Sequence, residues 1–235
     1  MTDTTASPTV RLDMWADIAC PWCFIGQVKL DAAIQAELAA GRAVDVRHRP
    51  FQLNPSLPPS GVDAAEHFAP IFGGEERMRE AFARTEGIAR DVGLAIDHAS
   101  MTKAANTRYA HAVVLSYDGD PHQRAVLMAM YSAYFEQGRD ITDHDVVHQV
   151  AAHASGESVD EVTARVASFD LAALDASFAL GRELGVSAVP TFVADAGADV
   201  DPDVQLSAAA VAVQGAQDAA TLQQVFAEAR RRAAA

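Results

Sequence analysis

The feature that most constrains this sequence is a Cys-Pro-Trp-Cys segment placed at a change of periodicity. Residues 10–18 alternate apolar and polar side chains, which predicts a β-strand with one buried side. From residue 24 to residue 40 the apolar side chains recur at the spacing of an α-helix face, and Gly41 is expected to end that helix. Cys20 and Cys23 therefore lie where a strand runs into a helix, which indicates an α/β fold.

The two cysteines are predicted to have unequal roles. A thiolate at a helix N-terminus faces unpaired backbone N–H groups and the positive end of the helix dipole, and both favour the ionised sulfur. Cys20 is expected at the mouth of the helix and Cys23 one turn inside, within reach of a mixed disulfide on Cys20. Pro21 suits the first helical position, where its missing N–H costs nothing. Trp22 is expected on the surface beside Cys20, offering an apolar face to a partner.

Three other interpretations of the cysteine pair compete with a redox role. Two buried small apolar residues are one, although the neighbouring Pro and Trp at a strand–helix junction disfavour it. Half of a zinc site is another, which requires two more ligands; His144 and His148 have helical spacing, but such pairs usually face solvent. A permanent disulfide is the third, and so short a loop would constrain the unfolded chain little. The sequence thus favours a redox pair and predicts no metal.

A second informative residue is Pro190, inside a β-rich run at residues 188–194. Proline interrupts strand pairing unless it lies at a sheet edge or follows a cis peptide bond. A cis bond would leave the main-chain groups of Val189 free to hold an extended substrate chain across Cys20. We therefore predict that Pro190 follows a cis bond and lies against the cysteines in space.

The periodicity of the chain predicts one fold interrupted by an insertion. Strand character is expected again at residues 43–49 and 208–213, a proline-rich loop at 50–59, and a closing helix at 221–232. Apolar spacing between about residues 63 and 184 is helical throughout. The predicted domains are therefore 10–62 with 185–235, and an inserted helical subdomain at 63–184.

Other polar residues are expected to have structural roles. The acidic stretch at residues 195–203 is expected to be a solvated turn, because it lacks the spacing of a calcium loop. His48, His67, His98 and His122 are expected at the surface, and His111 at the interface between the two predicted subdomains.

The charge and cysteine content exclude several classes of protein. With 18 Lys and Arg against 32 Asp and Glu, the formal net charge is −14, which disfavours binding to nucleic acid or to anionic membranes. The sequence has no apolar run long enough for a transmembrane helix, and its first residues lack the features of a secretory signal. Two cysteines cannot build a disulfide scaffold. The expected location is the cytoplasm.

The sequence resembles the DsbA-like branch of the thioredoxin superfamily, and within it the FrnE-like group. The resemblance covers nearly the whole chain and rests on the segments at residues 20–26, 49–55, 106–111, 189–192 and 215–217. It implies a thioredoxin fold with a large inserted α-helical subdomain, and thiol–disulfide exchange. It also implies that Cys20 is the nucleophile, that Cys23 is the resolving cysteine, and that Pro190 is cis.

Relatives with the same architecture leave two other functions open. In 2-hydroxychromene-2-carboxylate isomerases and kappa-type glutathione transferases a serine typically replaces the first cysteine, and glutathione is a cofactor. Here both thiols are present, which favours redox chemistry on protein or small-molecule disulfides and dithiols, without a bound cofactor. Residues 50–55 and 106–107 could either border a small-molecule pocket beside Cys20 or only fix a turn and cap a helix.

The alternatives are therefore a glutathione-dependent isomerase or transferase acting on a small aromatic substrate, with glutathione as co-substrate, and a redox-responsive, chaperone-like binding module. The sequence fits either a monomer or a homodimer.

Overall fold

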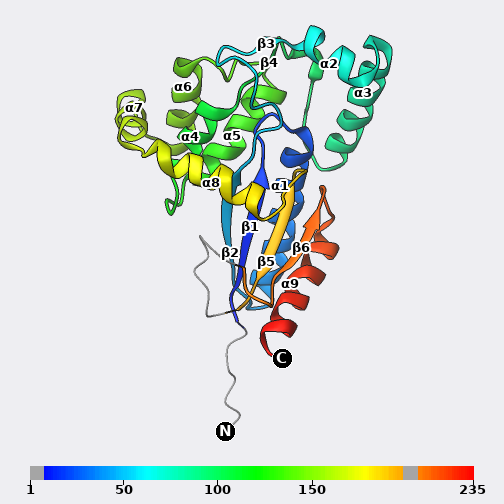
Figure 1. Cartoon of the computed structure of the whole chain (residues 1–235), viewed down its shortest axis with the longest axis vertical. Helices are drawn as coiled ribbons and strands as arrows, with labels where there is room; N and C mark the ends of the chain where they lie inside the picture. Colours follow the sequence, from blue (N-terminus) through cyan, green and yellow to red (C-terminus); the bar gives the residue numbers. More distant parts are fainter. Residues whose placement is uncertain (1–7, 198–205) are drawn as a thin grey trace.

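The computed structural model describes residues 8–197 and 206–235, and its centre is a four-stranded sheet with the order β2-β1-β5-β6. The strands are β1 (Val10–Ala16), β2 (Val44–Pro50), β5 (Thr191–Asp195) and β6 (Val211–Gln214). β1 and β2 are parallel, β5 is antiparallel to β1, and β6 is antiparallel to β5. Strands from the two ends of the chain therefore form one sheet, as the thioredoxin-fold expectation requires (Figure 1).

Side-chain alternation along β1 gives the sheet two apolar faces. Leu12 and Met14 are fully buried in the main core, together with residues of α1 (Pro21–Ala39) and α9 (Ala219–Ala233). Trp15 points to the opposite face and packs with Val193 and with residues of α8 (Leu171–Glu183). The predicted period of two is thus confirmed, and helices cover the sheet on both sides.

The segment between β2 and β5 is mainly helical, as predicted. Its elements in chain order are β3 (Val62–Asp63), α2 (Ala64–Phe72), α3 (Glu75–Asp91), the 3-10 helix η1 (His98–Ser100), β4 (Lys103–Ala104), α4 (Arg108–Leu115), α5 (Gln123–Phe135), α6 (His144–Ser155), α7 (Val159–Ser168) and α8. Helices α2 to α7 gather beyond the end of the sheet at which β1 runs into α1, whereas α8 crosses one face of the sheet (Figure 1). The small sheet of β3 and β4 was not predicted, because two-residue strands are too short to show a period.

Several acidic residues of this chain begin helices. Asp63, Asp143, Asp170 and Asp218 each precede a helix and accept a backbone N–H from its first turn. Ser158 forms a reciprocal capping box with the third residue of α7. Local chemistry therefore explains where these helices start.

The ends of two predicted strands differ from the structure. β5 begins at Thr191, directly after Pro190, because proline has no N–H to add to the ladder. The Pro190 carbonyl nevertheless accepts the N–H of Gly215 at 2.8 Å. β6 covers Val211–Gln214, since residues 208–209 form a turn.

The acidic stretch expected to be a solvated turn begins inside the sheet. Asp195 ends β5, is buried, and forms an ion pair with Arg11 at 3.0 Å, so the expectation was wrong for this residue. The part of that stretch at residues 198–203 lies outside the described residues.

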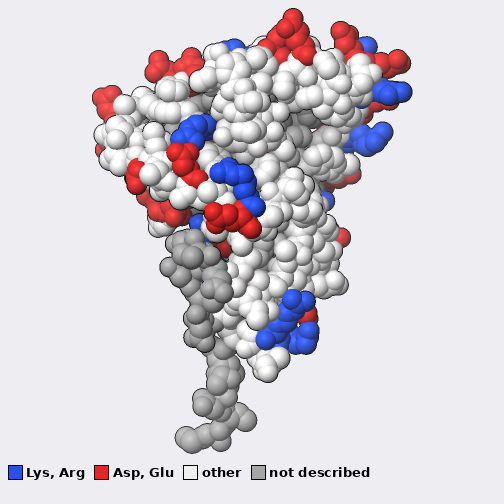
Figure 2. Space-filling model, in the orientation of Figure 1, with Lys and Arg blue, Asp and Glu red and all other residues white. Residues whose placement is uncertain are grey.

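The surface carries mixed charge. On the face shown in Figure 2, acidic side chains are spread over the helices at the upper end, and Lys and Arg side chains are scattered among them. This face therefore offers no continuous basic stripe of the kind that binds a nucleic-acid backbone. In the part of the chain that the structure describes, none of the helices is both long enough and apolar enough to cross a membrane.

Candidate active site

The two cysteines occupy the junction between β1 and α1. Cys20 is the residue immediately before α1, with an extended backbone, and Pro21 is the first helical residue, as predicted. The Cys20 carbonyl accepts the N–H of Cys23 at 3.0 Å, which closes the first turn. Both side chains are free thiols; Cys20 is 4% exposed and Cys23 is completely buried. Both thiols are therefore buried, and only Cys20 keeps a small exposed fraction.

The buried position of Cys23 changes its acidity. Burial raises the pKa of the Cys23 thiol well above its usual value, and the adjacent Cys20 and the negative charge of Asp17 add to this. Burial therefore favours the neutral thiol form of Cys23. Trp22, between the two cysteines, is 38% exposed, and its expected surface position is confirmed.

The Pro190 loop lies against the cysteine helix. The Val189–Pro190 peptide bond is cis, as predicted, and the Val189 carbonyl oxygen lies 3.8 Å from the Cys20 Sγ. A Cβ on Gly26 would lie 3.0 Å from Cγ of Pro190, so only glycine fits there without displacement of the loop. The Val189–Pro190 segment therefore lies beside Cys20 and α1, although the two segments are far apart in the sequence. The predicted contact of the Pro190 ring with the two sulfurs stays a prediction.

An apolar pocket opens beside Cys20. It has a volume of about 290 Å³ and lies between the start of α1 and the hairpin of α2 and α3. Cys20, Pro21 and Trp22 line one side, and Phe68, Phe72 and Phe82 line the other. The phenylalanine rings contact one another edge to face, with centroids 5.5–5.9 Å apart. The pocket can therefore hold an aromatic or aliphatic group next to the Cys20 sulfur.

Only some of the residues expected to border a pocket beside Cys20 line the pocket that the structure contains. Leu53 of the proline-rich loop lines it, whereas Asn106 does not. The Asn106 side chain donates to the Leu57 carbonyl at 2.6 Å and accepts the N–H of Arg108 at 3.0 Å. Asn106 thus fixes the loop to the start of α4, which agrees with the interpretation that this segment fixes a turn and caps a helix.

Sequence reasoning missed the buried polar residue Asp17. Its carboxyl group is 1% exposed and accepts the N–H groups of Leu53 at 2.7 Å and Ala19 at 3.2 Å. Nε2 of His111 lies 3.4 Å from this carboxyl group and 3.0 Å from the Phe51 carbonyl. His111 therefore links α4 to the end of β1 and the following loop, as expected. The sequence feature that could have identified Asp17 is its position, three residues before Cys20.

The surface assignment of the histidines was wrong for two of them. His98 is buried beside the pocket, where it stacks on Phe82 and its Nδ1 lies 2.9 Å from the Glu86 carboxylate. His48 is buried on β2, within the sheet, while His122 is exposed and His67 is half-buried. Their burial depends on neighbours distant in the sequence, which no local pattern reveals.

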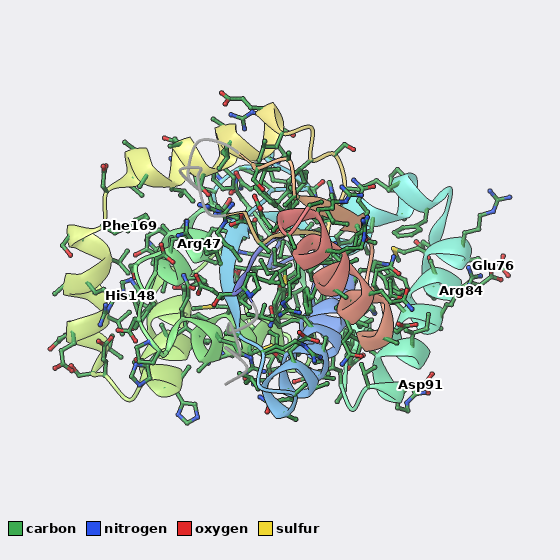
Figure 3. All side chains as sticks on the ribbon, turned by 90° about the horizontal axis from the view of Figure 1, so that it is seen from below. Arg47, Glu76, Arg84, Asp91, His148 and Phe169 are labelled. Atoms are coloured by element: carbon green, nitrogen blue, oxygen red, sulfur yellow. The ribbon has the colours of Figure 1, made fainter. Side chains whose placement is uncertain are left out.

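His148, one of the two histidines with the helical spacing of possible zinc ligands, has two hydrogen-bond partners. Nε2 of His148 lies 2.7 Å from the Tyr109 hydroxyl, and its Nδ1 lies 3.0 Å from the Thr163 hydroxyl. His148 lies among helices on the flank opposite α3, which carries Arg84 (Figure 3). Within residues 8–197 and 206–235, no three His, Cys, Asp or Glu side chains are grouped as a metal site would need.

Comparisons with known proteins agree with this geometry. Residues 11–227 match the family model described as "DSBA-like thioredoxin domain". A Bacillus subtilis protein, YwbO, is 24% identical over 194 residues, which are 79% of this chain and 86% of that protein.

Three solved structures share the fold of this chain. The crystal structure of a probable DsbA oxidoreductase from Streptomyces coelicolor is 25% identical, with 94% of this chain and 89% of that chain covered and a TM-score of 0.79. The cytosolic disulfide reductase DsbM from Pseudomonas aeruginosa shares the fold at 20% identity, with coverage of 94% and 95% and a TM-score of 0.57. A 2-hydroxychromene-2-carboxylate isomerase shares it at 14% identity, with coverage of 95% and 98% and a TM-score of 0.60. Because the family model spans most of the chain and the sheet, cysteine helix and cis-proline loop have the expected arrangement, this chain belongs to the DSBA-like thioredoxin-domain family.

Proposed function

We propose that this protein is a thiol–disulfide oxidoreductase in which Cys20 is the nucleophile and Cys23 the resolving cysteine. The observation that carries the proposal is the pair of free thiols at the start of α1, one beside an open pocket and one completely buried. Reaction with a substrate can then begin on only one sulfur, and the second is kept for the intramolecular step. The couple carries electrons itself and needs no metal or nucleotide.

The proposed reaction has two steps. The Cys20 thiolate attacks one sulfur of a substrate disulfide; the Cys20–substrate bond forms, the substrate S–S bond breaks, and the first substrate thiolate leaves with the electron pair. Cys23 then loses its proton and attacks the Cys20 sulfur. The Cys20–Cys23 bond forms, and the second substrate sulfur leaves and takes up a proton. The substrate is reduced and the protein oxidised; the reverse sequence oxidises a dithiol.

The surroundings of Cys20 support binding of an extended chain or a compact disulfide. The Val189 carbonyl faces the Cys20 sulfur and is placed to accept an N–H from a substrate backbone. Pro21 lines the pocket beside Cys20, Pro190 directly follows the Val189 carbonyl, and the exposed ring of Trp22 offers apolar contact area. Protein and small-molecule disulfides or dithiols are therefore the proposed partners.

Cysteine variants test the proposal. Cys20→Ser should abolish reduction of insulin by the protein and a dithiol, whereas Cys23→Ser should accumulate mixed disulfides on Cys20 because the resolving sulfur is gone. Adducts are read on non-reducing gels and assigned by mass spectrometry. Insulin reduction that survives in Cys20→Ser would refute the assignment, as would adducts found on Cys23 in the Cys20→Ser variant but none on Cys20 in Cys23→Ser.

The pocket favours one alternative, a glutathione-dependent isomerase or transferase acting on a small aromatic substrate. Its aromatic lining beside Cys20 could hold such a ring. An isomerase of this kind would bind glutathione without consuming it, and it would not need Cys23. Two results together would establish this alternative and exclude the dithiol mechanism. The purified protein would retain stoichiometric glutathione, and Cys23→Ser would keep the full isomerase or transferase activity of the wild type.

We also propose a cytoplasmic location, which is supported by the structural similarity to DsbM from Pseudomonas aeruginosa, a protein described as a cytosolic disulfide reductase. In that compartment the direction of the reaction follows from the reduction potential of the Cys20–Cys23 couple relative to the glutathione pool. Glutathione is accordingly proposed as a co-substrate that resets the couple.

A further inference from the structure

The apolar pocket beside Cys20 limits which substrates can reach the sulfur of that residue. Cys20 is only 4% exposed, and it lines the pocket. A group bonded to a sulfur that Cys20 attacks therefore lies at the mouth of this pocket or inside it. With a volume of about 290 Å³, the pocket has room for a ring or a short branched chain and not for a folded protein surface.

The charge at this pocket comes from one arginine. Among the described residues that line the pocket, Arg84 of α3 is the one with a permanent charge, and neither Asp nor Glu is among them. The Arg84 side chain is exposed and forms no hydrogen bond or ion pair with the described residues. Arg108, by contrast, pairs with the Asp175 carboxylate at 2.6 Å. The guanidinium of Arg84 is therefore available to pair with a carboxylate from outside the chain.

The other polar side chains that line the pocket already have partners or are buried. The hydroxyls of Thr85 and Tyr134 donate to backbone carbonyls at 3.0 Å and 2.8 Å. Nδ1 of His98 lies 2.9 Å from the Glu86 carboxylate, and the other ring nitrogen is buried. The side-chain N–H groups left for a ligand are therefore those of Arg84 and of the exposed Trp22 indole, and only Arg84 carries a charge.

We propose that the pocket binds the apolar arm of a small disulfide and that Arg84 binds a carboxylate on that arm. This inference rests on the proposed function and names its substrate class. Phe68, Phe72 and Phe82 would contact an aryl or branched alkyl group, while the guanidinium pairs with the anion where the pocket meets solvent. Because the chain has a net charge of −14 and repels anions in general, a local cation is needed to favour such a substrate.

The exchange with such a disulfide is balanced. The Cys20 thiolate forms a bond to the sulfur of one arm, the substrate S–S bond breaks, and the other arm leaves as a thiolate with the electron pair. Cys23 then loses its proton and bonds to the Cys20 sulfur, and the second arm leaves with its electron pair. The carboxylate and Arg84 keep their charges throughout, so Arg84 contributes to binding and takes no part in the electron transfer.

Two aromatic disulfides separate recognition of the anion from recognition of the ring. Dithiobis(nitrobenzoate) carries a carboxylate on each ring, whereas dithiodipyridine is neutral, and both release a coloured thiol that absorbance follows. Each is mixed in excess with the reduced full chain. Dividing the rate constant of a variant by that of the wild type cancels the different reactivities of the two reagents. Arg84→Gln should slow the reaction with dithiobis(nitrobenzoate) about fivefold. It should leave the reaction with dithiodipyridine unchanged.

Two further variants complete the test. Arg90→Gln is the matched control, because Arg90 also lies on α3, forms no hydrogen bond or ion pair with the described residues, and does not line the pocket. It makes the same change in net charge and should react with both reagents at the wild-type rates. Phe72→Ala removes part of the apolar wall at a residue that is 36% exposed. Both aromatic reagents should react more slowly with it, while hydroxyethyl disulfide, which has no ring, should react at the wild-type rate.

Several results would overturn the assignment of Arg84. An unchanged rate in Arg84→Gln would mean that no anion is bound, and equal slowing with both aromatic reagents would mean that the guanidinium acts on the Cys20 thiolate. The same slowing in Arg90→Gln would reduce the effect to overall charge. Slower insulin reduction by Arg84→Gln, without a slower reaction with dithiobis(nitrobenzoate), would mean that a peptide occupies the pocket.

The proposed function fails in a different way. If the wild-type protein released the coloured thiol without forming the Cys20–Cys23 disulfide, or released none, the dithiol mechanism would be refuted, and the substrate class with it. Mass spectrometry of the acid-quenched protein distinguishes these results from a loss of selectivity alone.

Discussion

The Asp17 carboxylate affects both the stability of the fold and the pKa of Cys23. Replacement of Asp17 by Asn should change each of these two properties measurably. The carboxyl group is buried at the end of β1 and accepts the N–H groups of Leu53 and Ala19. Asn has nearly the same shape, but it carries no charge and presents an NH₂ in place of one oxygen. Since an NH₂ cannot accept an N–H, one of the two hydrogen bonds is lost and the other becomes a bond between neutral groups.

The cost of this change can be worked from these two contacts. A hydrogen bond to a charged group contributes about 1.5–3 kcal/mol, and a bond between neutral groups about 0.5–1.5 kcal/mol. Losing one charged bond and weakening the other should therefore lower the free energy of unfolding of Asp17→Asn by about 3 kcal/mol. Urea unfolding followed by circular dichroism measures this difference.

The same substitution should accelerate the resolving step. The negative charge of Asp17 is one of the causes that raise the pKa of Cys23, so its removal should lower that pKa and favour the attacking thiolate. Reduced protein can be mixed with cystamine, a small symmetrical disulfide, and the mixed disulfide on Cys20 and the Cys20–Cys23 disulfide followed by mass spectrometry after acid quenching. The mixed disulfide should convert faster in Asp17→Asn than in the wild type.

Asp13→Asn provides the control for this prediction. Asp13 is an equally buried carboxylate on β1, and it pairs with Arg49 at 2.7 Å. Its replacement should also lower stability but should leave the resolving step unchanged. If Asp17→Asn resolved more slowly, the reasoning would be refuted, because the carboxylate would then be the acceptor of the Cys23 proton. Unchanged stability would refute the hydrogen-bond estimate.

The remaining predictions concern pH, packing and labelling. Burial lowers the pKa of His48 to about 4, below its unfolded value of 6.5, so its contribution to stability is complete above pH 6.5 and is lost as the pH falls toward 4. Wild-type stability should drop by about 2 kcal/mol more between pH 7 and pH 5 than that of His48→Gln, measured by urea unfolding; parallel curves would exclude this. Gly26→Ala should cost about 1–3 kcal/mol and slow insulin reduction, because the new methyl group displaces Pro190; an unchanged rate would mean that the loop position is not critical. Substoichiometric iodoacetamide should label Cys20 before the completely buried Cys23, and peptide mass spectrometry showing the reverse order would contradict the assignment of the nucleophile.

The local features of the fold could be predicted because their causes lie within a few residues. Alternation along β1, the change of period at Cys20 and Pro21 at the helix start are all properties of neighbouring side chains. Pro190 was informative for the same reason, since a proline in a β-rich run conflicts with its own strand whatever the rest of the chain does.

The boundaries of short elements could not be predicted with the same success. β3 and β4 have two residues each, too few for a period, and β5 starts one residue after the proline that was placed inside it. At such positions pairing with a distant strand, and not local preference, decides where a strand begins.

Only the tertiary structure decided which polar groups surround the cysteines. Asp17, His111 and Tyr131 come from the end of β1, from α4 and from α5, and each fits an ordinary local pattern. The packing of α5 on α1 brings the Tyr131 ring onto Phe24, and the α2–α3 hairpin closes the pocket beside Cys20. The sequence alone determined the position of the cysteine pair and the helix that presents it. The acidity of Cys23 and the shape of the pocket depend on groups far apart along the chain, because burial and electrostatic interaction act through space.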